Sequence, residues 1–168
     1  MSRRQPETWP PHPVVLSRER LKGLRHQINS LNPAIGEEIE GALCRFLAVR
    51  ACGHVEYVFD ECLATFVERI SARPVGSYVR SGLFSGRNPR PAELVARLSR
   101  LDVSWGSELE GYLNEDDQKR SRELAFLVSR RNAIAHGQNE GLNRRKALDV
   151  ADLAIELGDW FVIRLTPS

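Results

Sequence analysis

The sequence predicts an all-α fold, and two observations carry that prediction. Apolar residues recur at helical spacing in long blocks, such as residues 143–165, where one stripe holds Val150, Leu157 and Phe161. Proline and glycine separate these blocks, and strand-like alternation is nearly absent. Both features are typical of a helical bundle.

Length and composition indicate one globular domain. The 168 residues, 42% hydrophobic and 27% charged, suffice to bury a core, and no apolar run is long enough to cross a bilayer. We therefore expect a cytoplasmic protein with no membrane partner. Residues 1–13 lack the apolar segment of a secretory signal, so we interpret them as a disordered tail before a domain over residues 14–168.

Two helices are expected in the first half of the chain. The first covers about residues 17–31. Asn32 and Pro33 then provide an N-cap and a first-turn proline for a long central helix that extends to about Ser71.

Residues 72–91 are predicted to form the longest loop, because they are rich in glycine, serine and proline. Tyr78 and Phe84 lie among four arginines there, a combination that can bind single-stranded RNA. A flexible, solvated loop explains the same composition equally well. The arginines are Arg73, Arg80, Arg87 and Arg90.

Three further elements are expected after this loop. A third helix begins at Asn88-Pro89, and a short segment covers about residues 105–113. Asn114 then caps a helix that opens with three acidic residues and ends at Gly137, a residue suited to a left-handed C-terminus. The last helix covers about residues 143–165.

No metal or cofactor is expected. Cys44, Cys52 and Cys62 form no Cys-x-x-Cys pair, so we interpret them as small core residues. A glycine-rich phosphate loop is also absent from the sequence. The net charge of +2 does not by itself identify a nucleic-acid partner.

The penultimate helix holds the candidate chemistry. Arg131 falls on the apolar stripe of this helix, where a guanidinium is costly to bury unless it is paired or faces water. Glu56 of the central helix is a candidate partner, although an ion-paired arginine at a helix end is an ordinary structural feature. Asn132 and His136 lie one turn apart, so Asn132 would fix the imidazole tautomer by a hydrogen bond.

Residues 131–137, Arg-Asn-Ala-Ile-Ala-His-Gly, resemble the HEPN superfamily motif, an arginine, a polar residue, three variable positions and a histidine. The arrangement of helices extends the resemblance over about residues 35–165. Residues 48–56, Ala-Val-Arg-Ala-Cys-Gly-His-Val-Glu, also resemble the second-helix region of the RiboL-PSP-like HEPN branch. The resemblance implies a HEPN-like antiparallel bundle of four to five helices.

The resemblance also implies a function. HEPN ribonucleases are homodimers in which the motifs of both subunits face a shared cleft, and they cut RNA without a metal. Arg131 would stabilise charge on the phosphate, His136 would transfer protons, and Asn132 would complete the catalytic set. The products would carry 2′,3′-cyclic phosphates. Such enzymes act as toxins or antiphage-defence effectors, which implies a cognate antitoxin or regulatory protein.

Four other arginines are candidates for RNA binding: Arg130, Arg50, Arg144 and Arg145. Interface salt bridges or a solvated helix start explain them as well. The alternative function is a non-catalytic HEPN interaction or dimerisation module that partners another protein, such as a nucleotidyltransferase. A purely structural bundle would require the motif to be a coincidence.

Overall fold

The computed structural model describes residues 8–138 and 142–167. This part of the chain is helical and contains no strand, which confirms the all-α prediction. Its elements are α1 (His12–Asn29), the short 3-10 helix η1 (Pro33–Ile35), α2 (Glu37–Ile70), α3 (Arg73–Ser81), α4 (Pro91–Ser99), α5 (Val103–Ala135) and α6 (Arg144–Arg164).

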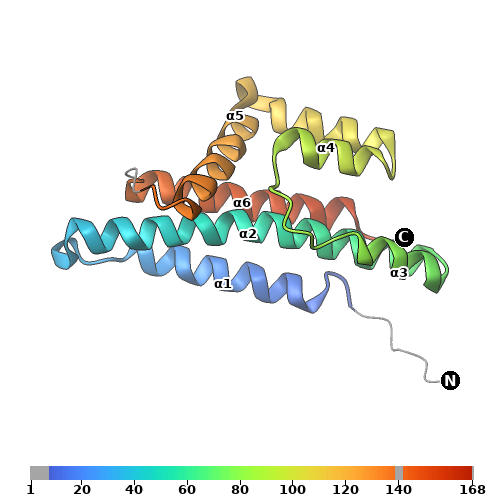
Figure 1. Ribbon diagram of the computed structural model, residues 1–168, viewed down its shortest axis with the longest axis horizontal. Helices are drawn as coiled ribbons and strands as arrows, with labels where there is room; N and C mark the ends of the chain where they lie inside the picture. Colours follow the sequence, from blue (N-terminus) through green and yellow to red (C-terminus); the bar gives the residue numbers. More distant parts are fainter. Residues whose placement is uncertain (1–7, 139–141, 168) are drawn as a thin grey trace.

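The long helix α2 is the centre of the bundle. It packs against α1, α3, α5 and α6, and α1 and α6 also contact each other. In Figure 1, α1, α2 and α6 lie side by side along the long axis, while α4 and the first half of α5 form a hairpin above them. The second half of α5 descends from this hairpin onto α2 and α6.

The core forms around α2 because this helix is apolar on several sides. Leu47, Val55 and Phe59 are fully buried, and the rings of Phe59 and Phe161 meet edge to face at 4.9 Å. Burial of this apolar surface is the main driving force for folding. Within the described residues, no helix is both long enough and apolar enough to cross a membrane.

The three cysteines are buried, free thiols on α2, which confirms their interpretation as core residues. Burial raises the pKa of the Cys52 thiol to about 11 and that of Cys62 to about 12. Both thiols therefore stay protonated at neutral pH, and a thiolate is the form that reacts.

Two salt bridges join α1 to α6. Arg18 Nε and Asp159 Oδ1 are 2.6 Å apart, and Arg25 Nη2 and Asp152 Oδ2 are 2.7 Å apart. Each arginine donates two hydrogen bonds to its aspartate. Exposed pairs contribute little free energy, so their main effect is to fix the register of the two helices.

The domain begins earlier than the sequence predicted. Helix α1 starts at His12 rather than near residue 17, so it starts inside the segment 1–13 that was expected to be a disordered tail. Before it, the indole Nε1 of Trp9 donates to the carbonyl of Val162 at 3.0 Å. The rest of the expected tail, residues 1–7, lies outside the described residues.

The start of α2 also differs from the prediction. Asn32 does cap a helix, since its Oδ1 accepts a hydrogen bond from the Ala34 amide at 2.9 Å, but that helix is η1. Gly36 then turns the chain with φ +87°, and α2 starts at Glu37. A positive φ of this size is accessible to glycine at little cost.

The expected loop over residues 72–91 is wrong, because it contains α3. Gly76 allows α3 to approach α2 closely, since a Cβ at this position would lie 3.0 Å from the Glu68 Cα. Arg80 binds the carboxylates of Glu68 and Glu61, with Nε and Glu68 Oε1 2.7 Å apart. The next helix, α4, starts at Pro91 rather than at Asn88-Pro89.

The sequence predicted a short segment over about residues 105–113 and a separate helix capped by Asn114. The structure instead has one element, α5, whose two helical segments meet at a bend. Its N-cap is Asp102, whose carboxylate accepts from the Ser104 amide at 2.8 Å. Asn114 is not a cap as predicted, because residues 115–118 are non-helical and Asp116, Asp117 and Gln118 have positive φ. This turn makes the sharp bend of α5 in Figure 1.

His54 is a buried polar side chain of α2. It is 4% exposed, its Nδ1 lies 2.8 Å from the Ser17 hydroxyl, and a Cβ on Gly158 would lie 2.9 Å from its Nε2. Burial lowers the pKa of His54 to about 4; Asp159 opposes this shift, and Arg18 and Arg50 reinforce it. The imidazole is therefore neutral at pH 7.

We expect His54 to make the fold sensitive to mild acid. Unfolded histidine has a pKa of about 6.5, so the unfolded chain binds the extra proton first as the pH falls. The free energy of unfolding should drop by about 2 kcal/mol between pH 7 and pH 5 through this residue. Urea unfolding at both pH values, followed by circular dichroism, measures the difference.

A His54→Gln variant should show a smaller loss over this range, whereas His26→Gln, at an exposed position of α1, should behave like the wild type. Equal losses in all three proteins would show that His54 does not titrate as described.

Candidate active site

The motif helix ends in a Schellman turn at Gly137, as the sequence predicted. Gly137 has φ +75°, its amide donates to Ile134 at 3.0 Å, and the Gln138 amide donates to Ala133 at 3.0 Å. His136 is the C-cap residue. This turn places its imidazole at the exposed end of α5.

The three motif residues differ in exposure and partners. Arg131 and Asn132 are half-buried, and Arg131 Nη1 donates to Asn132 Oδ1 at 3.2 Å. His136 is exposed. The predicted hydrogen bond between Asn132 and His136 is not among the hydrogen bonds of the described residues; Asn132 Oδ1 accepts from Arg131. In this single chain, His136 remains open to solvent and to a binding partner.

Arg131 faces α2, where it lies close enough to Cys52 and Glu56 to change both pKa values. Burial raises the pKa of Glu56, the nearby Asp60 raises it further, and Arg131 and Arg97 lower it. The core-facing arginine therefore lies near the Glu56 carboxylate. The pairing that the sequence suggested is not among the salt bridges of the described residues, and Arg131 donates to Asn132 instead.

A second charge pair holds α4 against α2. Asp60 is 2% exposed and binds Arg97 of α4 through Oδ1. Its Oδ2 accepts from the Phe84 amide at 2.9 Å, and the Arg97 guanidinium lies 4.6 Å from the Phe59 ring centroid. One buried carboxylate therefore fixes both α4 and the turn before it.

These contacts build one wall of a groove beside the motif. The groove has a volume of about 510 Å³ and lies between the start of α4 and the second half of α5. Asn132 is the motif residue that reaches it, and no carboxylate is among the residues that line it. The lining residues are Arg90, Pro91, Ala92, Ala125, Val128, Ser129 and Asn132.

Two of the other candidate arginines lie away from this groove. Arg50 lines a pocket between α1 and α2, a different face of α2 from the one that Arg131 approaches. Arg144 binds the carboxylate of Glu40 at 2.6 Å and the carbonyl of Leu31 at 3.2 Å. The structure therefore does not bring Arg50 or Arg144 together with the motif.

The remaining two candidates have different surroundings. The Arg130 guanidinium lies 5.1 Å from the Phe126 ring centroid, directly beside the motif in sequence. Arg145 is exposed but lines a hollow that also contains Asp149 and Asp152, which weakens its attraction for phosphate.

The part that α4 plays in this site was not predicted from the sequence. Arg90 and Ala92 were assigned to a loop and to a helix start, with no link to the motif. The contact depends on Asp60 and Arg97, which are 37 positions apart, and local sequence patterns do not reveal such a pair.

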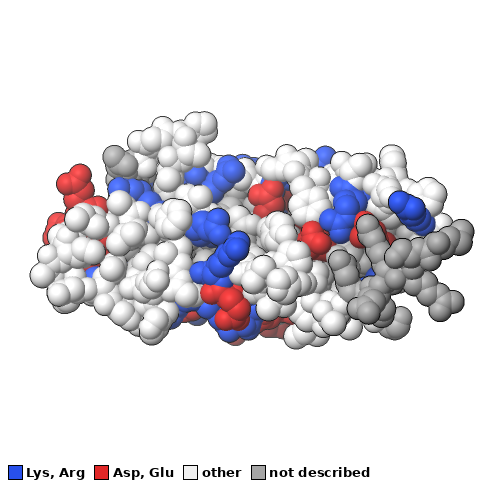
Figure 2. Space-filling model, turned by 90° about the horizontal axis from the view of Figure 1, so that it is seen from below, with Lys and Arg blue, Asp and Glu red and all other residues white. Residues whose placement is uncertain are grey.

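On the face that α1 lines, charged side chains form small groups rather than one basic patch. Figure 2, seen from the α1 side, shows lysine and arginine side chains interspersed with aspartate and glutamate. In the part of the chain that the structure describes, no three His, Cys, Asp or Glu side chains form a group that could hold a metal ion.

An all-helical bundle with an Arg-Asn-x-x-x-His motif at the end of its penultimate helix defines a domain of the HEPN type. The family model described as RiboL-PSP-HEPN matches residues 16–166, and the chain belongs to this family. Comparison with curated proteins and with solved structures gives no significant match.

We expect the Asp60→Asn variant to lose about 3 kcal/mol or more of unfolding free energy, because it leaves the buried Arg97 charge uncompensated. The exposed pair of Asp117 and Arg122 provides the control, since Asp117→Asn should change stability by less than about 1 kcal/mol. Urea unfolding of the three proteins measures both effects. Equal midpoints for the two variants would contradict this role of Asp60.

Proposed function

We propose that this protein is a metal-independent endoribonuclease. The observation that carries the proposal is the exposed His136 at the end of α5, on the same helix as a half-buried Arg131 that donates to Asn132. Membership of a HEPN-type family supports it, because HEPN domains are often ribonucleases.

The chemistry follows from the two side chains. A ribose 2′-oxygen attacks the adjacent phosphorus, and the bond to the 5′-oxygen breaks. His136 accepts the 2′-hydroxyl proton or delivers one to the leaving oxygen, and Arg131 stabilises the negative charge on the phosphate. The products are a 2′,3′-cyclic phosphate and a 5′-hydroxyl. DNA is not a substrate, because it lacks the 2′-hydroxyl.

The groove beside Asn132 gives the RNA strand a path to the motif. Its α4 wall is the N-terminal end of a helix, where the peptide dipoles favour negative charge, and Arg90 is exposed there. Backbone contacts of this kind position RNA without reading its sequence. We include Arg130 in this path and leave out Arg50 and Arg144.

The active form is a homodimer in this proposal. The N-terminal half of α2 carries an exposed apolar stripe, with Ile39 55% and Phe46 52% exposed and Ala42 exposed between them. Such stripes typically mark contacts with another protein surface. Figure 1 shows the C-terminal end of α5 lying over the same half of α2, so a second copy seated on the stripe would bring two motifs together.

An RNA-cutting protein of this kind would be a toxin or an antiphage-defence effector, held in check by a cognate antitoxin or regulatory protein. The alternative function, a non-catalytic interaction module, uses the same apolar stripe as its binding surface but requires no chemistry at His136.

Replacement of His136 by alanine should abolish cleavage of total RNA in EDTA, a loss of at least about 100-fold, because the variant lacks the proton-transfer group. The measurement is the amount of 2′,3′-cyclic phosphate ends released. The matched control is His26→Ala, an exposed histidine of α1, which should cut like the wild type. Cleavage by His136→Ala at the wild-type rate, or its absence in all three proteins, would favour the interaction module.

A charge on the apolar stripe should separate the subunits. Phe46→Glu places a carboxylate at the expected interface, so sedimentation should show monomers where the wild type shows dimers, and RNA cleavage should fall with it. Ile163→Glu, on an exposed position of α6, tests a similar change elsewhere and should leave the dimer intact. A monomeric wild type that cuts RNA would contradict the shared cleft.

A further inference from the structure

A second pocket lies between α1 and α2, on a face of α2 that Arg131 does not approach. Its volume is about 340 Å³, which falls within the range of small-ligand sites. Five side chains with polar groups line it: Ser17, Arg20, Arg50, His54 and Tyr57. No carboxylate is among its lining residues. The remaining lining residues are Pro13, Leu16, Leu21 and Gly53.

The positive charge in this pocket is not neutralised by the protein. Arg20 and Arg50 are exposed, and within the described residues neither forms an ion pair with an acidic side chain. Other arginines of α1 behave differently, since Arg18 and Arg25 each bind an aspartate of α6. Two unpaired guanidinium groups beside one hollow are suited to bind a dianion.

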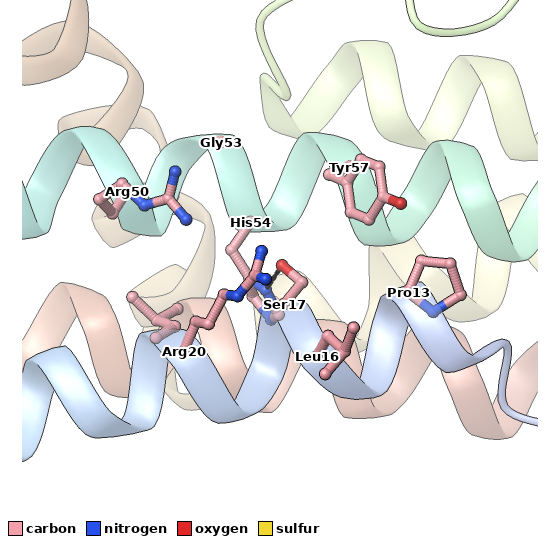
Figure 3. Close-up of a pocket in the computed structure, with 9 residues that line it drawn as sticks. Pro13, Leu16, Ser17, Arg20, Arg50, Gly53, His54 and Tyr57 are labelled. Carbon is pink, nitrogen blue, oxygen red and sulfur yellow. Dashed lines mark hydrogen bonds between the residues drawn. The ribbon is translucent and has the colours of Figure 1, made fainter.

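The two ends of the pocket differ in chemistry. Figure 3 places Arg20 and Arg50 at one end and Tyr57 and Pro13 at the other, with the hydroxyl of Tyr57 turned away from the arginines. The Tyr57 ring is half-buried. A ligand that spans the pocket would therefore meet charge at one end and a ring surface at the other.

Gly53 keeps the space between these ends open. It lies on α2 between Arg50 and Tyr57, and a Cβ added to it would meet no atom within 4 Å. Glycine inside a helix costs about 0.5–1 kcal/mol relative to alanine. At this position it leaves the pocket unobstructed.

We propose that the pocket between α1 and α2 binds a small phosphate monoester, with the phosphate on Arg20 and Arg50 and the organic part against Tyr57. Ribose phosphates and nucleotides share this chemistry. The proposal concerns a site separate from the motif and does not depend on ribonuclease activity.

The experiment is calorimetric titration of the full chain with adenosine 5′-monophosphate, ribose 5-phosphate and inorganic phosphate. The Arg20→Gln/Arg50→Gln double variant should bind the preferred ester at least about 10-fold more weakly, because it lacks the charged donors. Arg100→Gln/Arg122→Gln removes the same total charge from exposed positions elsewhere and should bind normally. Gly53→Leu should block the pocket, whereas Gly23→Leu, at another open helical position, should not.

The proposal is supported if either ester binds more tightly than inorganic phosphate and if this binding is lost in the Arg20/Arg50 and Gly53 variants. Comparison of the two esters then shows whether a base contributes to the affinity. Binding must also survive in His136→Ala, since its loss would place the ligand at the motif. Failure of both esters to bind at millimolar concentration, or equal binding of all three probes, would overturn the proposal.

Discussion

The buried contact between Asp60 and Arg97 is the constraint on which the arrangement of the site depends. A carboxylate that is 2% exposed is tolerated in the core only when its oxygens are paired, and here Arg97 and the Phe84 amide pair both of them. These partners belong to α4 and to the turn before it. Asp60 therefore helps to hold the α4 wall of the groove against α2, while Trp105 and Tyr112 of α5 make separate contacts with α2 and α6.

The motif itself is divided between two environments. Arg131 is turned toward Glu56 and the core, while His136 stands at the end of the helix in solvent. Arg131 donates a hydrogen bond to Asn132, which restricts the orientation of its guanidinium. The imidazole has no such restraint among the described residues. A second subunit or the RNA itself would supply it, which is consistent with a site assembled between two chains.

The sequence predicted the fold class, the cysteine environment and the Gly137 terminus, because each depends on a local pattern. It also suggested Glu56 as a partner for Arg131, but Arg131 only lies near this carboxylate and donates to Asn132 instead. Helix α3 was missed because its segment is rich in glycine and proline, which predicts a loop. Its stability comes from contacts with Glu68, which the local sequence pattern does not indicate. The acidic residues 115–117 lie at the bend of α5. The sequence predicted a helix start there, because acidic residues are common in the first turn of a helix. The catalytic roles of Arg131, Asn132 and His136 stay predictions.

The pairing of α1 with α6 has a consequence for how the chain folds. Arg18 must find Asp159 at a separation of 141 positions, and Arg25 must find Asp152 at 127. Contacts of such long range impose a large loop-closure cost and slow the folding of a domain relative to a local helical hairpin. If these bridges form after the transition state, their removal will accelerate unfolding and leave the refolding arm of a chevron plot unchanged. The register of α1 against α6 would then be fixed late in folding, after most of the core has formed.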